Sequence, residues 1–150
     1  MSLIRVLLIT SLLVLLIGCS SEQVQSSKSG VFKQPIVQFP KVNSKGDTGR
    51  SLPTAEVPLM FWQSFEYKDI SRPALSGHTK ENFCVIKETE GIPVQEGAAV
   101  KFIEDAECFF THFTSLDGVP HKYMVGLIKI RIPETGEEGW TWTSAVDLKE

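Results

Sequence analysis

The sequence predicts a mainly β domain at residues 53–150, preceded by an export signal and a flexible tether. Three observations predict this organisation. Period-two alternation and β-branched or aromatic residues recur in four runs after residue 80. No apolar pattern of helical period and useful length follows Gly77. Gly, Pro and Asp residues separate the runs, and the length that follows the signal suits one domain.

Residues 1–18 have the three-part layout of a secretory signal. Arg5 supplies the positive charge at the start, and residues 6–17 are apolar apart from Thr10 and Ser11. This apolar run is shorter than the roughly 20 residues that span a membrane, and polar residues end it abruptly. We therefore expect the signal to be removed rather than kept as a transmembrane anchor.

Cys19 follows Leu16-Ile17-Gly18 at the end of this signal. These four residues resemble the lipobox of bacterial lipoproteins, in which the cysteine receives a thioether-linked diacylglycerol before the chain is cut in front of it. The resemblance implies a lipid on Cys19 and attachment to a membrane of the cell envelope. Two serines follow, with no Asp beside the cysteine, which implies the outer membrane, facing the periplasm, if the cell is Gram-negative. The alternative is a cysteine that is only one more apolar residue of the signal.

Residues 19–52 are predicted to carry the lipidated N-terminus and a flexible tether. They are rich in Ser, Lys, Gln, Gly and Pro, and their apolar residues follow neither helical nor strand spacing. Residues 31–40 are the exception, because Phe32 and Phe39 lie there among other apolar residues and the prolines exclude a helix. We expect a spacer that keeps the domain clear of the lipid headgroups. The alternative is a segment that becomes ordered along a partner or an edge strand.

The folded domain is expected to begin with the segment Pro58–Tyr67. This segment carries so many large apolar groups that it must be buried to avoid an exposed sticky patch. Residues 73–78 follow it and are predicted to form a loop, since they include Pro73 and Gly77.

Four strands are predicted after this loop. The last is the clearest, because Ile128 and Ile130 point to one face while Lys129 and Arg131 point to the other. A tight connection at residues 105–106 favours a hairpin between the second and third strands. The four predicted strands are residues 82–87, 99–104, 107–113 and 122–132.

The last part of the chain contains a second recognisable arrangement. A polar turn at residues 133–139 precedes Trp140-Thr141-Trp142, a strand with both tryptophans on one face, and residues 143–148 form a short helical turn and a closing strand. This arrangement is similar to the end of bacterial SH3-like domains. The resemblance covers residues 82–148 and implies a small SH3-like β-barrel. The Asn-Val-Arg-Ser-Gly-Pro signature of the peptidoglycan-binding members is absent, so their ligand specificity is not implied.

The chain has three cysteines. If Cys19 carries a lipid, Cys84 and Cys108 remain and can pair. In an oxidising envelope compartment a disulfide would stabilise a small domain by about 3 kcal/mol. We expect this bond; the alternative is two free, buried thiols.

No catalytic residue, metal site or cofactor is predicted. A cysteine hydrolase needs a free thiolate beside a histidine, and the expected disulfide removes the thiolate. Cys108 and His112 are four residues apart, with Asp117 and His121 in the next loop. On a strand, however, residues four apart stand about 13 Å from each other, too far to share a metal ion.

The charge pattern bears on the partners. The formal net charge is −3 and both signs are interspersed, so no basic patch suited to nucleic acid is visible. Trp142, Glu137 and Glu138 are the candidate residues of a binding surface, while Trp140 is expected in the core.

These observations predict a membrane-anchored, non-catalytic binding module for an envelope protein complex or for the cell-wall polymer, peptidoglycan. The alternative is an inhibitor, immunity or surface-exclusion lipoprotein. An enzyme would require an unexpected cleft with convergent polar groups.

Overall fold

The structure of this protein, a computed structural model, describes residues 28–40, 52–74 and 77–149. It confirms the mainly β class, because within these ranges the chain forms thirteen strands, two 3₁₀ turns and no α-helix. None of the described elements is a helix long and apolar enough to cross a membrane. The predicted export signal and Cys19 lie outside the described residues and remain predictions.

The larger sheet has five strands in the order β12-β11-β8-β1-β13, and all neighbours are antiparallel. The alternation predicted for the last long run is confirmed. Ile128 and Ile130 are buried, whereas Lys129 is half-buried and Arg131 is exposed. The five strands are β1 (Ser29–Phe32), β8 (Ala99–Asp105), β11 (Leu127–Arg131), β12 (Glu138–Trp142) and β13 (Val146–Leu148).

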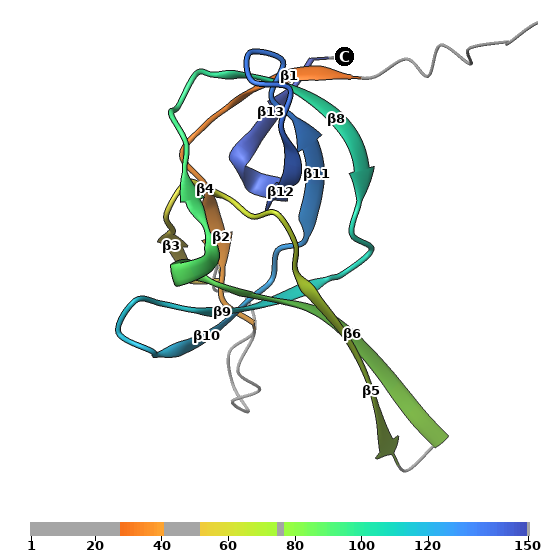
Figure 1. Ribbon diagram of the computed structural model, residues 1–150. Helices are drawn as coiled ribbons and strands as arrows, with labels where there is room; N and C mark the ends of the chain where they lie inside the picture. Colours follow the sequence, from red (N-terminus) through yellow and green to blue (C-terminus); the bar gives the residue numbers. More distant parts are fainter. Residues whose placement is uncertain (1–27, 41–51, 75–76, 150) are drawn as a thin grey trace, which may run out of the picture.

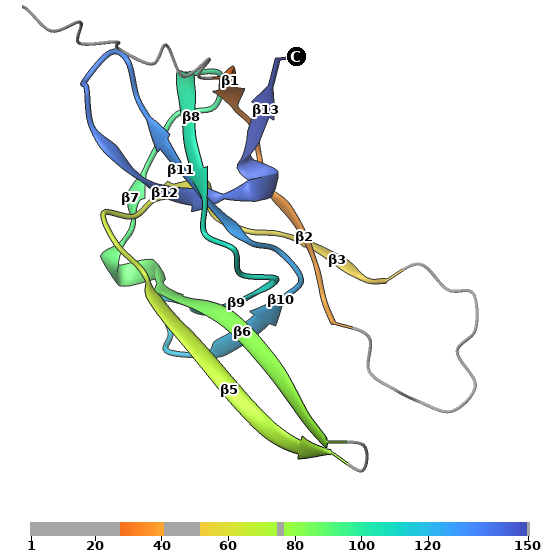
Figure 2. The same ribbon diagram turned by 90° about the vertical axis from the view of Figure 1, so that its right-hand side faces the viewer.

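The second sheet has four strands in the order β10-β9-β6-β5. β6 and β9 are parallel, and the other neighbours are antiparallel. The β5–β6 hairpin projects from the body at the end opposite β1 and β13 (Figures 1 and 2). The four strands are β5 (Glu66–Ala74), β6 (Gly77–Lys87), β9 (Phe110–Thr114) and β10 (Pro120–Tyr123).

Two short antiparallel pairs and two 3₁₀ turns complete the fold. The pair that contains Phe61 packs closely on the larger sheet. This packing explains Gly139 in β12, because a Cβ there would lie only 2.6 Å from the Phe61 ring. The remaining elements are β2 (Ile36–Gln38), β3 (Thr54–Glu56), β4 (Met60–Phe61), β7 (Ile92–Pro93), η2 (Glu88–Glu90) and η3 (Thr143–Ala145).

The core consists of two apolar clusters. One joins the two sheets, because it combines Cys84, Ile86 and Phe113 of the four-stranded sheet with Leu127 and Trp142 of the five-stranded sheet. The other packs on β1, β4, β8, β11 and β13. Its buried members are Phe32, Phe61, Val100, Ile128, Ile130 and Val146.

The prediction that residues 19–52 form a tether is wrong for residues 28–40. β1 lies inside the larger sheet, between β8 and β13, and β2 pairs with β3. Phe32 and Val37 are each only 1% exposed. Residues 28–40 therefore belong to the folded domain, which is not confined to residues 53–150, and they pair with the chain's own strands.

Three local predictions are also wrong. β8 and β9 do not form a hairpin but belong to different sheets, because the chain turns at Glu107, whose φ of 55° is in the left-handed region. The run 122–132 is divided between β10 and β11, and Gly126 lies at the break, where a Cβ would be 2.6 Å from the Cys108 carbonyl oxygen. The predicted loop at residues 73–78 is mostly strand, since β5 reaches Ala74 and β6 starts at Gly77.

The predicted small barrel is not found: within the described ranges the strands form open sheets and no closed barrel. The physical reason is that β1 is inserted between β8 and β13, while β9 and β10 leave for the second sheet. The order of elements predicted for the end of the chain is nevertheless present, as strand β11, a polar turn, strand β12, the η3 turn and the closing strand β13.

Candidate functional site

The predicted disulfide between Cys84 and Cys108 is confirmed. Its Cα atoms are 5.8 Å apart and the cysteines are separated by 24 positions in the sequence. Cys84 lies in β6, and Cys108 lies in the connection between β8 and β9. Both residues are buried. The bond fastens the base of the projecting β5–β6 hairpin to the body of the protein.

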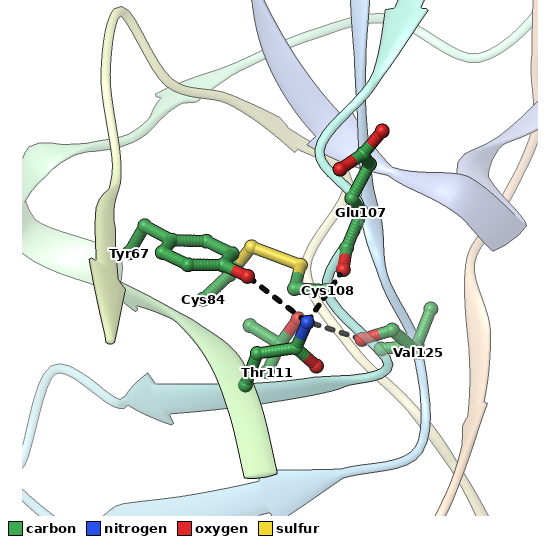
Figure 3. The surroundings of a disulfide bond; sticks show 7 residues. Tyr67, Cys84, Glu107, Cys108, Thr111 and Val125 are labelled. Atoms are coloured by element: carbon green, nitrogen blue, oxygen red, sulfur yellow. Dashed lines mark hydrogen bonds between the residues drawn. A yellow bond between two sulfur atoms is a disulfide. The ribbon is translucent and has the colours of Figure 1, made fainter. Parts of the chain in front are cut away.

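Hydrogen bonds hold the backbone on both sides of this disulfide (Figure 3). The Asn82 amide nitrogen donates to the Tyr67 hydroxyl at 2.9 Å and to the Glu107 carbonyl at 3.2 Å. The buried Thr111 hydroxyl donates to the Val125 carbonyl at 2.7 Å. The disulfide and these hydrogen bonds join three segments: the β5–β6 hairpin, residues 107–111 and the segment at Val125. This arrangement favours a rigid base for the hairpin.

Two exposed aromatic side chains lie next to the disulfide. Tyr67 is the register partner of Cys84 and is 48% exposed. Phe109 directly follows Cys108 and is 62% exposed, with its ring packed edge-on against Phe110 at 4.9 Å. Exposed apolar groups that form one patch are typical of contact surfaces.

A shallow open cleft of about 430 Å³ adjoins Phe109. Its wall is mostly apolar, with the hydroxyl-bearing Thr143 and Ser144 on one side. The Ser144 hydroxyl is buried and has no hydrogen-bond partner among the described residues. We call Tyr67, Phe109 and this cleft the disulfide surface. The cleft is lined by Cys108, Phe109, Met124, Val125, Gly126, Thr143 and Ser144.

His112 lies away from this surface, on the other face of the four-stranded sheet. Its ring stacks on Phe83 at 4.2 Å, and Phe83 alternates in β6 with the disulfide-bonded Cys84. Burial, together with the nearby Lys122 ammonium, lowers the pKa of His112. His112 and Cys108 are therefore on opposite sides of the sheet and cannot act on one ligand together.

Ser115, Asp117 and His121 do meet, in the loop between β9 and β10. The Ser115 hydroxyl hydrogen-bonds to the Asp117 carboxylate, and its oxygen lies 3.2 Å from His121 Nε2. That hydrogen bond holds the pKa of Asp117 below its usual range. The Ser115 hydroxyl also lies 3.0 Å from the Val119 carbonyl oxygen, so these contacts join residues of one loop and stabilise it. Among the described residues, no three His, Cys, Asp or Glu side chains are grouped so that they could hold a metal ion.

The prediction that Trp142 belongs to a binding surface is wrong. Its side chain is 0% exposed, its ring nitrogen donates to the Pro58 carbonyl at 3.0 Å, and its ring packs edge-on against Trp62 at 5.3 Å. Trp140 was expected in the core but is half-buried, against Phe65 at 4.6 Å. The two tryptophans share a face of β12, but the second sheet covers only the end that carries Trp142.

The two predicted glutamates do not join Trp142 at a single surface. Glu138 is at the opposite end of β12, where it hydrogen-bonds to Arg131 and lies 3.9 Å from the Lys129 ammonium. The bond from Arg131 lowers the pKa of Glu138. Glu137 is exposed and accepts a hydrogen bond from the Thr135 hydroxyl at 3.1 Å. Of the three predicted residues, Glu137 alone retains a fully exposed position.

Sequence reasoning missed Tyr67 and Phe109 as surface residues because both occur in strongly apolar runs that predict burial. The pattern of residues around Phe109 gave no signal of its exposure, because β9 begins only at Phe110 and the two rings pack against each other. Comparisons with protein-family models, with curated proteins and with solved structures find no match to this chain.

Proposed function

We propose that this protein is a lipoprotein of the bacterial cell envelope that acts as a non-catalytic binding module for an envelope protein complex or for peptidoglycan. The observation that carries the proposal is the disulfide surface. It combines two exposed aromatic rings with a mostly apolar cleft, a combination that favours a partner over solvent. Because the disulfide and its hydrogen bonds already hold the backbone, little ordering is needed when a partner binds.

The proposed anchor is the lipid on Cys19. The lipobox resemblance supports it, and a disulfide suits the oxidising compartment to which such a signal leads. Residues 20–28 connect the cysteine to β1 and can span at most about 30 Å. The domain is then held close to the membrane, in place of the long tether expected from the sequence.

The proposal predicts that Phe109→Ser lowers recovery of the partner about ten-fold. An exposed aromatic ring at the centre of a contact surface is a typical binding hot spot, and its truncation costs at least 1–2 kcal/mol. The lipidated protein should be isolated from detergent-solubilised envelopes and its co-purifying proteins quantified. Sedimentation with isolated peptidoglycan tests the polymer in parallel.

Leu116→Ser is the matched control for this experiment. Leu116 is 71% exposed and lies in the β9–β10 loop, outside the disulfide surface. We expect the control to recover as much partner as the wild-type protein. An equal loss in both variants, or in neither, would contradict the proposed surface. A wild-type protein that recovers neither host proteins nor peptidoglycan would favour the inhibitor, immunity or surface-exclusion alternative.

A further inference from the structure

β5 is the edge strand of the four-stranded sheet and is nine residues long. No strand of the described residues pairs with its outer side. β6 pairs with β9 only over residues 83–87, so the hairpin has just two strands toward its tip (Figures 1 and 2). A two-stranded hairpin that stands alone is marginally stable in water, and a third strand would stabilise it.

We propose that β5 receives an extended strand from a different polypeptide, which pairs along its outer edge and enlarges the sheet. This inference rests on the proposed function as a binding module and names the kind of partner. Main-chain hydrogen bonds along the edge would supply the affinity, and the side chains of β5 would supply the selectivity.

The charges along β5 indicate the chemistry of that partner. Glu66 and Lys68 lie on one face of the strand, with their charged groups 3.3 Å apart and side chains 63% and 46% exposed. Asp69 lies on the other face and is exposed. A complementary strand places an acidic residue opposite Lys68 and a basic residue opposite Asp69, because opposite charges on facing positions attract.

The same charges act against pairing with a second copy of this chain. Residues 66–69 and Ser71 are exposed and Ile70 is half-buried. A two-fold antiparallel pair that uses most of residues 66–71 is centred on Lys68 or on Asp69. Either register places two like charges directly opposite each other, which destabilises the pair. Charged residues commonly protect edge strands in this way. These charges therefore disfavour pairing of β5 with a second copy of this chain but allow pairing with a strand of complementary charge.

The position of the hairpin makes this edge accessible. β1, which follows the proposed lipid anchor, lies at the end of the molecule opposite the hairpin tip (Figures 1 and 2). The hairpin therefore lies at the end of the domain opposite the strand that follows the proposed anchor. The disulfide at Cys84 and an ion pair between Glu81 and Lys122 of β10 fix β6 to the body, so the edge of β5 is presented in one orientation.

Two capped peptides of identical composition and net charge test the inference. Thr-Val-Lys-Glu-Tyr-Thr, paired antiparallel with residues 71 to 66, places Lys opposite Asp69 and Glu opposite Lys68. Thr-Val-Glu-Lys-Tyr-Thr exchanges these two charges. Binding to the full, detergent-solubilised protein is measured by fluorescence anisotropy of labelled peptide. We expect the first peptide to bind about ten-fold more tightly than the second.

A charge-exchange variant provides the decisive comparison. Lys68→Glu with Asp69→Lys keeps the net charge and should invert the preference between the two peptides. Asp147→Lys with Lys149→Glu exchanges opposite charges in β13, the edge strand of the other sheet, and directly after it, and should leave the preference unchanged. Hydrogen exchange should slow at amides of β5 and not at those of β13.

Equal binding of the two peptides, absence of both, or a preference that the Lys68 and Asp69 exchange does not invert would overturn the inference. If the peptides fail while Phe109→Ser still lowers recovery of an envelope partner, the binding module stands and strand addition at β5 is excluded. If neither experiment shows binding, both proposals fail.

Discussion

Replacement of Trp142 by alanine is expected to lower the free energy of unfolding by about 4 kcal/mol. The indole is fully buried and packs against Trp62 and Phe113, with ring centroids 5.3 and 5.5 Å away. Its removal leaves a large cavity between the two sheets and an unpaired carbonyl at Pro58, which now accepts the indole hydrogen bond. A loss of this size is a large part of the stability of a small domain.

Urea unfolding followed by circular dichroism measures this loss. Trp140→Ala is the matched control, because Trp140 lies on the same face of the same strand but is only half-buried. We expect the control to lose about 1–2 kcal/mol. If Trp142→Ala kept full stability and instead reduced partner binding, the burial of Trp142 would be contradicted and its surface role restored.

Removal of the disulfide, by Cys84→Ala with Cys108→Ala, is expected to cost about 3 kcal/mol of stability. The bond closes a loop across 24 positions of the sequence and so limits the conformations of the unfolded chain. For a domain of this size the melting temperature should fall by roughly 10–20 °C. Thermal unfolding of the wild-type and variant proteins, with and without a reductant, provides the measurement.

Reduction should bring the wild-type protein to the stability of the double variant and should leave the variant unchanged. Alkylation of the envelope protein under denaturing, non-reducing conditions should then find neither Cys84 nor Cys108 free. Two alkylated thiols in the native protein would contradict the bond and reopen cysteine-based chemistry at this site.

Local pattern was sufficient to predict the β class, the alternation in β11 and the disulfide. In β11, Ile128 and Ile130 alternate with charged residues, so a single strand carries its own signal of which face is buried. The prediction of the cysteine pair needed only the count of cysteines and the oxidising compartment that the predicted export signal implies.

β1 and β2 could not be predicted in this way. Both strands are short. β1 relies on Phe32, next to the exposed Lys33, and β2 relies on Val37, between the exposed Ile36 and Gln38. No period is visible in so short a run. The partners of these strands, β8, β13 and β3, come later in the chain, so the burial that orders them is a tertiary effect.

The candidate site was predicted less well than the fold because exposure depends on where one sheet stops covering the other. Trp140 and Trp142 have the same periodicity, yet only Trp142 lies under the second sheet. Phe109 stands in an apolar run, but the turn at Glu107 and the disulfide at Cys108 turn it toward solvent. These constraints come from residues far apart in the sequence.

Labelling of growing cells with palmitate is the most direct test of the central proposal, a binding module anchored to the envelope through Cys19. The wild-type chain should incorporate the label, be cut before Cys19 and fractionate with the membranes. Cys19→Ser should incorporate no label and should remain uncut or leave its normal anchor. Equal incorporation in the two proteins would contradict lipidation at Cys19 and with it the membrane-anchored account.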